Sequence, residues 1–436
     1  MSWGFSTDPE FQERLDWIER FITEEVEPLD IVADFDPYEV ANPKRNALVR
    51  PLQDEVRRQG LWACHLEPEL GGQGFGQLKL ALMNEILGRS IFGPTVFGVQ
   101  APDTGNAEIL AKYGTEDQKT RFLRPLLNND IVSAFSMTEP QGGSDPTQFK
   151  CRAVLDGDEW VIAGEKWFSS HAHVASFLIV MAVTDPDAPP HRRLSAFVVP
   201  TDTPGLEMVK NMPHGNRNGS SHAYLRYNDV RIPRDHILGG RGEGFVVAQT
   251  RLGGGRIHHA MRTLAQCKKA LAMTCERALS RVTQGSKLSE KQLVQEKIAD
   301  SWIEIEQFRL LLLQTAWKID QLKDYKAVRR DIAAVKVMMP KVLHDISSRA
   351  LHIHGSLGLT PDMPFVDQLL DSYHVGLADG PTEIHKLTVA KLTLREHQPT
   401  DGLFPTGYIP HLREAALRKY GDIDAADVVE AERALL

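Results

Sequence analysis

The sequence predicts a mixed α+β protein with an N-terminal helical domain, a central β domain of barrel or sandwich type, and a C-terminal four-helix bundle. Three observations predict this order. Helical periodicity extends to about residue 127, short β-branched and aromatic runs occupy about 131–240, and two long apolar stripes at helical spacing follow. We therefore expect domains at 1–130, 131–240 and 241–395, and a C-terminal extension over 396–436.

The first helix is indicated by apolar residues that step by three and four positions, which places them on one helical face. These are Phe11, Leu15, Ile18, Ile22 and Val26. Pro28 is expected to end this helix, because proline lacks the amide that an interior helical position needs.

The β domain is indicated by short runs separated by Gly, Pro and Asp turns, namely WVIAG, FLIVMAV, LSAFVVP and AYLRYNDVRIP. Beyond it, two stripes at helical spacing predict two long helices, which each need a partner and so imply a bundle. The first stripe is Val294, Ile298, Trp302, Ile305, Phe308, Leu312, Ala316 and Ile319. The second is Ile332, Val335, Met339, Val342, Ile346, Ala350 and Ile353. We expect both stripes to form core.

The bulk composition is that of an ordinary globular protein, 42% hydrophobic and 25% charged, with a net charge of −8. This balance argues against nucleic acid as the main partner. The four cysteines show no zinc-ligand or disulfide pattern, and no metal site is indicated. The start lacks a leader signature and the apolar runs are too short to span a bilayer, so we expect a cytoplasmic protein.

Asp379 is the acid that raises the functional question, in the stretch LADGPTEIHK at 377–386. One interpretation is helix capping, because Asp accepts backbone N–H groups at a helix start and Pro381 suits the first turn. The other is a general base aimed at a carbon acid. This stretch alone leaves both interpretations open.

Four glycine- or hydroxyl-bearing segments could hold a ligand. FSMTEPQGGSDP (135–146) offers backbone amides and hydroxyls to an anionic or heteroaromatic group, or is a bare turn. GEKWFSSHA (164–172) offers rings and hydroxyls, or packs in the core. RLGGGRIHHAMR (251–262) suits the close passage of a chain or ligand, or is a linker. HIHGSLG (352–358) reads most simply as a helix C-cap.

The order of these motifs resembles the flavin-dependent acyl-CoA dehydrogenases over nearly the whole chain. GLWACHLEPELGGQGF resembles the N-terminal signature of that family, KYGTEDQKTRFLRPLL the segment before the β domain, and FSMTEPQGGSD the flavin loop. LRYNDVRIP resembles the last strand motif of the β domain, and LADGPTEIHK falls where the family carries its catalytic carboxylate. The resemblance therefore implies the acyl-CoA dehydrogenase fold and favours Asp379 as the base.

The resemblance also assigns residues to FAD. Near the flavin ring and its ribityl or phosphate groups it places Phe135, Met137, Thr138, Gly143, Ser144, Phe168 and Ser170. For the adenosine diphosphate half, bound across a subunit boundary, it gives Arg281, Gln284, Gln292, His352, Gly355 and Ser356. Thr382 and Glu383 would close over the cofactor after the base. Phe168 replaces the family Trp, and His352 replaces the family Gln.

Two features suggest a particular branch. Asp replaces the usual Glu as the base, and QAPDTGN with ADGPTEIH resembles the group whose animal members are fused to phosphotransferase-like domains, none of which we expect here. Some relatives carry the base just before the helix Arg, a slot that holds Gly255 before Arg256. We therefore expect no second base.

The implied reaction is removal of the α-proton of an acyl-CoA thioester by Asp379 while the β-hydride passes to flavin N5, which gives a trans-2-enoyl-CoA. Burial is expected to raise the pKa of Asp379. The implied partners are acyl-CoA, electron-transfer flavoprotein and further copies of the chain, as a homodimer or homotetramer. The alternatives are a flavin oxidase of the same fold, acting on acyl-CoA or nitroalkanes, and a non-catalytic subunit.

The substrate side is predicted from GVQAPDTGN, which aligns with the family segment at the far end of the acyl pocket. Gln100 and Asp103, with Arg256 from the later helix, are the substrate-binding candidates. Together with Thr104 and Asn106 they would favour an acyl tail with a hydroxyl or other polar group. The alternative is that Asp103 and Asn106 cap the next helix.

Overall fold

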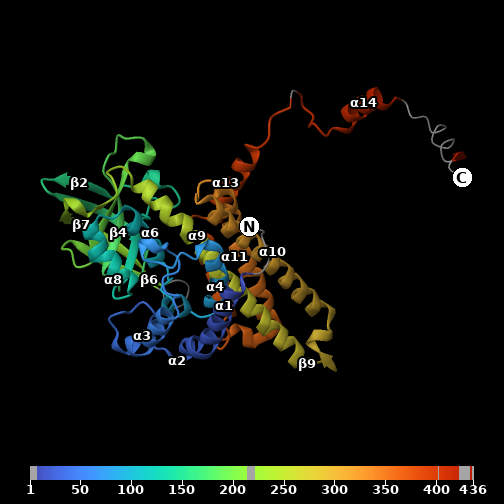
Figure 1. The fold of residues 1–436 in the computed structure, drawn as a ribbon, viewed down its shortest axis with the longest axis horizontal. Helices are drawn as coiled ribbons and strands as arrows, with labels where there is room; N and C mark the ends of the chain where they lie inside the picture. Colours follow the sequence, from blue (N-terminus) through green and yellow to red (C-terminus); the bar gives the residue numbers. More distant parts are fainter. Residues whose placement is uncertain (1–6, 214–220, 401, 422–432, 435–436) are drawn as a thin grey trace. The chain divides into compact units, whose positions relative to one another are not determined.

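The computed structural model describes residues 7–213, 221–400, 402–421 and 433–434. The chain forms two units, Met1–Val389 and Ala390–Leu436. Within the first unit, N-terminal helices, a β-sheet domain and a C-terminal helical domain follow one another (Figure 1). The predicted fold class is confirmed.

The N-terminal helices surround an apolar core. Asp8 caps the first of them by accepting a hydrogen bond from the amide of Phe11 at 2.9 Å. Phe11, Leu15 and Ile18 are buried, as the periodicity predicts. The helices are α1 (Pro9–Phe21), α2 (Glu27–Val32), α3 (Pro43–Arg58), α4 (Gly76–Leu87), α5 (Gly93–Val96), α6 (Asp103–Tyr113), α7 (Glu116–Gln118) and α8 (Arg124–Leu127).

The prediction that Pro28 ends the first helix is wrong. The backbone stays helical through a wide π turn at Ile22–Val26 and continues into α2. Pro28 then lies in the first turn of α2, a position that tolerates a residue without an N–H.

The middle domain is one sheet with strand order β6-β7-β3-β2-β4-β5-β8, to which β1 adds by parallel pairing with β4. FLIVMAV and LSAFVVP form the antiparallel pair β4 and β5, whose side chains are almost all buried. The strands are β1 (Ser133–Ser136), β2 (Arg152–Asp156), β3 (Glu159–Ser170), β4 (Phe177–Val183), β5 (Leu194–Pro200), β6 (Leu206–Pro213), β7 (Ser221–Pro233) and β8 (Ile237–Leu238).

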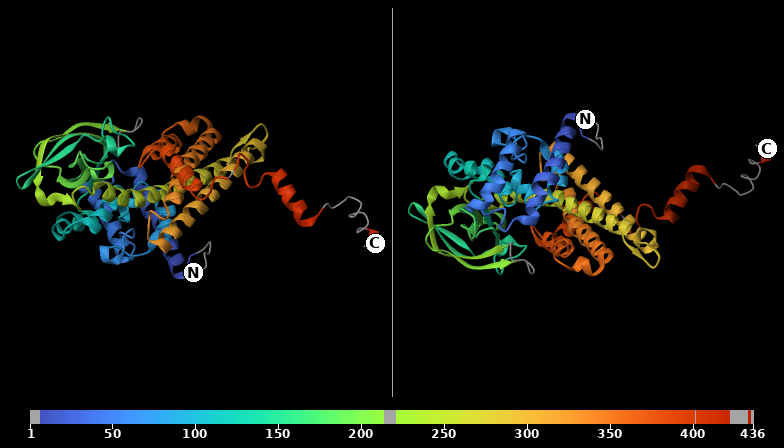
Figure 2. Two further views of the ribbon diagram at one scale, coloured as in Figure 1. Left: turned by 90° about the horizontal axis from the view of Figure 1, so that it is seen from above. Right: turned by 90° about the horizontal axis from the view of Figure 1, so that it is seen from below.

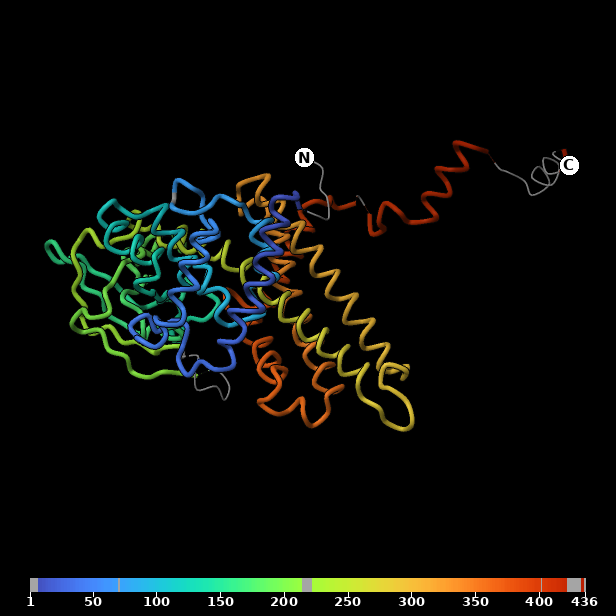
Figure 3. Tube along the Cα trace, turned by 60° about the horizontal axis from the view of Figure 1, so that its bottom comes forward, coloured from blue at the N-terminus to red at the C-terminus, as the bar shows by residue number. Residues whose placement is uncertain are grey.

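The C-terminal domain packs four long helices together and adds a fifth, α13, after a short turn. The long helices are α9 (Gly244–Ser280), α10 (Gln292–Leu322), α11 (Arg329–His354) and α12 (Phe365–Leu377), and α13 is Thr382–Leu394. A short hairpin of β9 (Val282–Thr283) and β10 (Ser286–Lys287) joins α9 to α10 (Figure 3). Figures 1 and 2 show α9 passing from the sheet domain into the bundle.

The second predicted stripe is core on α11, but the first is core only in its later part. Ile305, Phe308 and Leu312 are buried, whereas Trp302 is 59% exposed. The expectation that Trp302 packs inside its own chain is therefore wrong. Helical spacing identifies an apolar face without telling whether the same chain covers it.

All four cysteines are free, and three of them are buried. No described helix combines the length and apolar character needed to cross a membrane. In the second unit the described residues form one helix after the end of α13, α14 (Ile409–Tyr420).

Candidate active site

A cavity of about 280 Å³ lies where α9 and the α12–α13 turn meet the N-terminal loops and the end of β3. Its lining is strongly polar, and it includes the predicted base. The lining residues are Tyr38, Pro94, Ala101, Pro102, Thr104, Gly105, Ser170, His171, His222, Arg251, Gly255, His259, Arg262, His374, Ala378 and Asp379.

Asp379 lies in the turn between α12 and α13, with its side chain 16% exposed. Its φ of 57° is in the left-handed region, which Asp tolerates better than most residues. The guanidinium Nε of Arg256 donates to the Asp379 carbonyl at 2.9 Å, and the carboxylate Oδ2 is 3.8 Å from Nε2 of His259. The main chain is thus anchored while the carboxylate faces the cavity.

The capping interpretation of Asp379 finds no support in its contacts. Among the described residues, no amide of α13 donates to its carboxylate, and the Thr382 hydroxyl instead donates to the carbonyl of Gly376 at 3.2 Å. The carboxylate is therefore not engaged in holding the helix start.

The charge state of Asp379 differs from the sequence-based expectation. Burial alone raises the pKa of its carboxyl, but nearby positive charge outweighs burial and lowers that pKa below its ordinary value. The groups responsible are His259, Arg251, Arg256 and Lys336. Burial lowers the pKa of His259 to about 3, so at neutral pH the two arginines and the lysine keep Asp379 ionised.

The three glycines of RLGGGRIHHAMR lie inside α9, so this segment is not a linker. Each of these glycines lets a side chain from elsewhere in the protein approach the α9 backbone closely. A Cβ atom on Gly253 would lie 3.0 Å from the ring of Tyr325, and one on Gly255 would lie 3.2 Å from Oδ2 of Asp379. The slot where some relatives carry their base is therefore adjacent in space to Asp379.

Sequence reasoning missed most of the cavity wall. Arg251, Gly255, His259 and Arg262 are spaced by four, four and three residues, a helical stripe that could have been found had the glycines been read as helical. Tyr38, His222 and His374 come from three distant segments and carry no local signal. Groups of three metal-ligating side chains are not found in the described residues.

The predicted flavin loop leaves β1 and runs beside β3. The carbonyl of Met137 accepts from Nζ of Lys166 at 2.7 Å, and that of Thr138 accepts from the amide of Trp167 at 3.0 Å. Further along the loop, a Cβ atom on Gly143 would meet nothing within 4 Å, and Ser144 has a φ of 64°. The ring of Phe135, on β1, lies 4.1 Å from the Arg251 guanidinium.

A buried ion pair, also missed by sequence reasoning, fixes this loop. Lys166 and Glu139 are 0% and 1% exposed, and their charged atoms are 2.8 Å apart. The Glu139 carboxylate also accepts from the amides of Lys150 and Cys151 at 2.6 and 3.0 Å. The pair therefore holds both ends of the loop against β3.

Of the candidates on β3, Ser170 lines the cavity and Phe168 does not. The hydroxyl of Ser170 is 2.9 Å from Nδ1 of His222. Phe168 has a φ of 53° and is 45% exposed, which is unusual for a large apolar residue in a strand.

The candidates for the adenosine diphosphate half lie away from Asp379. Arg281 follows the end of α9, roughly 39 Å along the helix axis from Gly255. Gln284 is in the hairpin turn and Gln292 begins α10. His352 lies in the last turn of α11, and Gly355 and Ser356 directly follow that helix. Thr382 and Glu383 begin α13 beside the base.

The polar segment of the substrate prediction is bonded mainly to itself and to β1. Asp103 accepts from the amide and hydroxyl of Ser133 at 2.8 and 2.6 Å, and from Nε2 of Gln100 at 3.1 Å. Asn106 donates to the Ser133 hydroxyl at 2.9 Å. Within this segment Thr104 lines the cavity, whereas Gln100 and Asp103 do not, and Asp103 makes no cap on α6.

The guanidinium of Arg256 also has a structural role, because it donates a hydrogen bond to the carbonyl of Asp379. Arg256 is not among the residues that line the cavity, and its role in substrate binding stays a prediction.

The fold and the site together define an enzyme with a buried, ionised carboxylate in a cavity between helical and sheet domains. Family profiles match the chain in order: acyl-CoA dehydrogenase, N-terminal domain over residues 8–130, middle domain over 134–230 and C-terminal domain over 242–394. The chain belongs to the acyl-CoA dehydrogenase family and is an oxidoreductase of that class. The predicted family is confirmed.

Individual relatives support this family assignment. FadE2 of Mycobacterium tuberculosis is 39% identical over 391 residues, covering 87% of this chain and 94% of FadE2. Acyl-CoA dehydrogenase family member 11 of Rattus norvegicus is 38% identical over 356 residues, covering 80% of this chain. The chain spans only 45% of that longer relative.

Solved structures show the same fold. A protein from Mycobacterium abscessus superimposes with a TM-score of 0.83 at 36% identity, covering 90% of this chain and 100% of that one. Butyryl-CoA dehydrogenase from Megasphaera elsdenii superimposes with a TM-score of 0.77 at 26% identity, with the same coverage.

Proposed function

We propose that this protein removes the α-proton of an acyl-CoA thioester with Asp379 and so forms a 2-enoyl-CoA. The observation that carries the proposal is the Asp379 carboxylate, which is largely buried, is ionised, and lines a cavity. A general base must be deprotonated and within reach of the carbon acid, and this carboxylate has no hydrogen-bond donor among the described residues to occupy it.

The main chain of the same residue suits the second requirement, a donor for the enolate oxygen. The Asp379 carbonyl is bonded to Arg256, but its N–H has no backbone acceptor among the described residues. A donor aimed at developing charge stabilises the transition state more than the ground state. Substrate binding would also exclude water from the cavity, which raises the pKa of Asp379 toward that of a stronger base.

The residues fit FAD. The loop 135–144 has open space at Gly143, is fixed by the Glu139–Lys166 pair, and lies beside the exposed ring of Phe168, a surface suited to a heteroaromatic ring. When bound, FAD would accept the hydride equivalent from the β-carbon. Phe135, Met137, Thr138 and Ser144 would hold it from the loop, with Ser170 at the cavity side.

The remaining FAD candidates favour a homo-oligomer. Arg281 and His352 are far from the cavity along α9 and α11, so contacts to the same FAD would have to come from a second copy. Exposed apolar side chains on α10, Trp302 and Ile303 among them, suit such an interface. Electron-transfer flavoprotein is the proposed electron acceptor.

Asp379→Asn tests the proposal. The variant should fold, retain FAD and bind acyl-CoA, while anaerobic flavin reduction slows by roughly 10²–10⁴ or more. The measurement is stopped-flow bleaching of the flavin with butyryl-, octanoyl- and palmitoyl-CoA. Reduction within tenfold of wild type would place the base elsewhere.

A second measurement on the wild type distinguishes the dehydrogenase function from the rival oxidase function. The substrate-reduced protein is mixed with air-saturated buffer, and flavin reoxidation is followed with and without electron-transfer flavoprotein. Slow reoxidation by oxygen that electron-transfer flavoprotein accelerates is expected of a dehydrogenase. Rapid reoxidation by oxygen alone would identify an oxidase.

A further inference from the structure

A pair of stacked rings lines the cavity that contains Asp379. The centroids of Tyr38 and His171 are 3.7 Å apart and their planes differ by 16°. Tyr38 comes from the loop between α2 and α3, and His171 directly follows β3. Both residues line the cavity, so their stack forms part of its wall.

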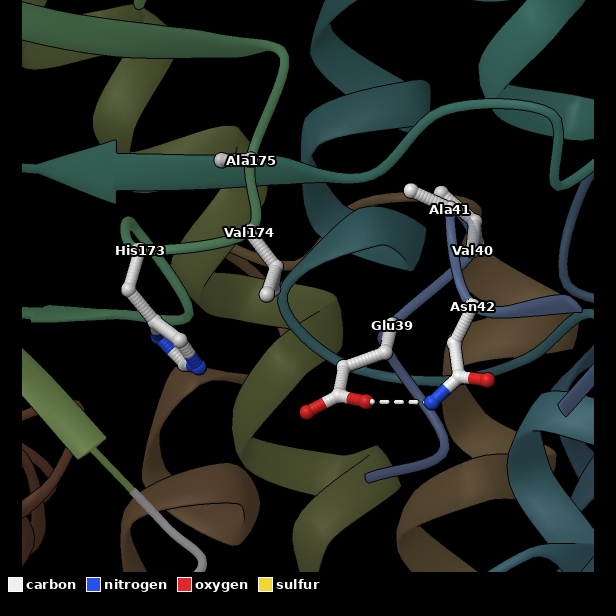
Figure 4. Close-up of a pocket in the computed structure, with 7 residues that line it drawn as sticks. All are labelled: Glu39, Val40, Ala41, Asn42, His173, Val174 and Ala175. Carbon is white, nitrogen blue, oxygen red and sulfur yellow. Dashed lines mark hydrogen bonds between the residues drawn. The ribbon is translucent and has the colours of Figure 1, made fainter. Parts of the chain in front are cut away.

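A second pocket, of about 540 Å³, is lined by residues that neighbour Tyr38 and His171 in the sequence (Figure 4). It is formed by residues 39–42 on one side and 173–175 on the other. Glu39 directly follows Tyr38, and His173 is two residues beyond His171. The same two segments therefore line both spaces, and Tyr38 and His171 are the residues of these segments that face the first cavity.

The stack is at the end of the cavity beyond the carboxylate. Asp379 lies against Gly255 and His259 of α9, and Arg262 is one to two turns further along the same helix. Arg262 donates to the carbonyl of Val99 at 3.3 Å, and the Tyr38 hydroxyl donates to that of Ala101, two residues later, at 2.6 Å. Tyr38 therefore belongs to the Arg262 end.

We propose that the Tyr38–His171 stack is the floor of the acyl cavity and limits the length of the acyl chain, and that the outer pocket receives a longer chain when the stack opens. This proposal rests on the proposed acyl-CoA dehydrogenase function. It assigns a specificity role to two residues that sequence reasoning did not select.

The lining of the outer pocket suits an alkyl chain and not the CoA moiety. Four of its residues are small and apolar, and none of the seven that line it is Lys or Arg. The carboxylate of Glu39 would repel the phosphates of CoA. The apolar residues are Val40, Ala41, Val174 and Ala175.

His171 is the half of the stack that can move. Its φ of 60° is unusual for a residue with a side chain, and strained positions of this kind gather at functional sites. Its Nδ1 is buried and has no hydrogen-bond partner among the described residues. Tyr38, in contrast, is anchored through its hydroxyl to Ala101. Rotation of the His171 ring therefore breaks no hydrogen bond of Nδ1, and the stacking contact with Tyr38 is what the ring would lose.

Tyr38→Ala tests the floor, and Tyr38→Phe is the matched control because it keeps the ring and removes only the hydroxyl. The FAD-loaded proteins are compared with butyryl-, octanoyl-, lauroyl- and palmitoyl-CoA by anaerobic flavin reduction. Kd values for the corresponding unreactive alkyl thioethers of CoA are also measured. Tyr38→Ala should raise the ratio of longest-chain to shortest-chain efficiency by about tenfold or more, and Tyr38→Phe should keep the wild-type ratio.

His171→Ala is a second route to the same result if Tyr38→Ala does not fold. Unchanged chain-length ratios in folded, FAD-containing Tyr38→Ala or His171→Ala protein would contradict the proposal that the stack limits the length of the acyl chain. Binding of the thioethers without any flavin reduction in the wild type would reject the dehydrogenase function instead, while the Kd ratios still decide the floor. A wild type that binds no thioether rejects both.

Discussion

A Cβ atom placed on Gly255 would lie 3.2 Å from Oδ2 of Asp379. Two positions 124 residues apart, 255 and 379, therefore share one small volume at the Asp379 end of the cavity. Because that volume accepts one functional side chain, the glycine is what allows the carboxylate from the α12–α13 turn to occupy it.

Gly255→Ala should slow flavin reduction by roughly tenfold, because a shift of the carboxylate by a few tenths of an ångström disturbs proton abstraction. The same change should not lower Tm, since alanine favours a helix interior over glycine by about 1 kcal/mol. The measurements are stopped-flow reduction and thermal unfolding. Gly253→Ala, which crowds Tyr325 instead, is the matched control, and an equal loss of rate in both variants would contradict the role of Gly255.

Acid should destabilise the protein through its buried histidines, and His65 is the clearest case. Both of its ring nitrogens are buried without a hydrogen-bond partner in the described residues, and burial lowers its pKa to about 3. Between pH 6.5 and 3 the unfolded chain binds a proton there that the folded chain does not, so stability falls as the pH falls. The loss at pH 5 is about 1–2 kcal/mol.

His65→Leu should therefore flatten the decline of Tm between pH 7 and pH 5. The replacement also removes two buried polar atoms without partners, so Tm at pH 7 should not decrease. Parallel pH curves for wild type and variant would show that His65 takes up its proton in the folded protein as readily as in the unfolded one.

Glu139→Gln should destabilise the protein by about 3–5 kcal/mol, because it leaves the Lys166 ammonium buried without its counter-charge. The FAD content should fall as well, since Glu139 holds the loop 135–144. The measurements are the unfolding midpoint and the ratio of flavin to protein absorbance. The double variant Glu139→Gln, Lys166→Met should recover part of the stability, and no recovery would mean that the amide contacts of Glu139 matter more than the pair.

Asp103→Ala should lower stability without changing the preference between hydroxylated and plain acyl-CoAs of equal length. Its carboxylate joins the start of α6 to β1 through Ser133, and each buried donor left without a partner costs about 1–3 kcal/mol. Thr104→Val is the comparison, because Thr104 lines the cavity. A changed preference in Asp103→Ala would bring this carboxylate into the substrate site.

The elements of the fold that were predictable from sequence are those with a long local period. The stripe from Ile332 to Ala350 needs no information from elsewhere in the chain, and it forms α11 as predicted. Trp302 shows the limit, because a periodic apolar face looks the same whether the same chain or another one covers it. The continuation of the helical backbone past Pro28 was missed, because the wide π turn before it has no simple sequence signal.

The site divides in the same way. Asp379 could be selected as a candidate because it stands in a motif with a fixed position, and it does line the cavity. Tyr38 and His374 could not be selected, because only folding brings them to this cavity. The direction of the Asp379 pKa was missed for the same reason. Burial is a local expectation, but the charges of Arg251 and Lys336 come from α9 and α11.

Helix α9 spans 37 residues without a break, about 55 Å of continuous backbone hydrogen bonding. Its first half supplies part of the wall of the cavity, and its second half packs one face into the bundle. A bend between the halves would have to break that hydrogen bonding, so the wall cannot shift as a hinged lid does. We expect the enzyme to adapt to its ligand by rotamer changes within a stiff frame, and crystal structures with and without acyl-CoA should superimpose along the whole of α9.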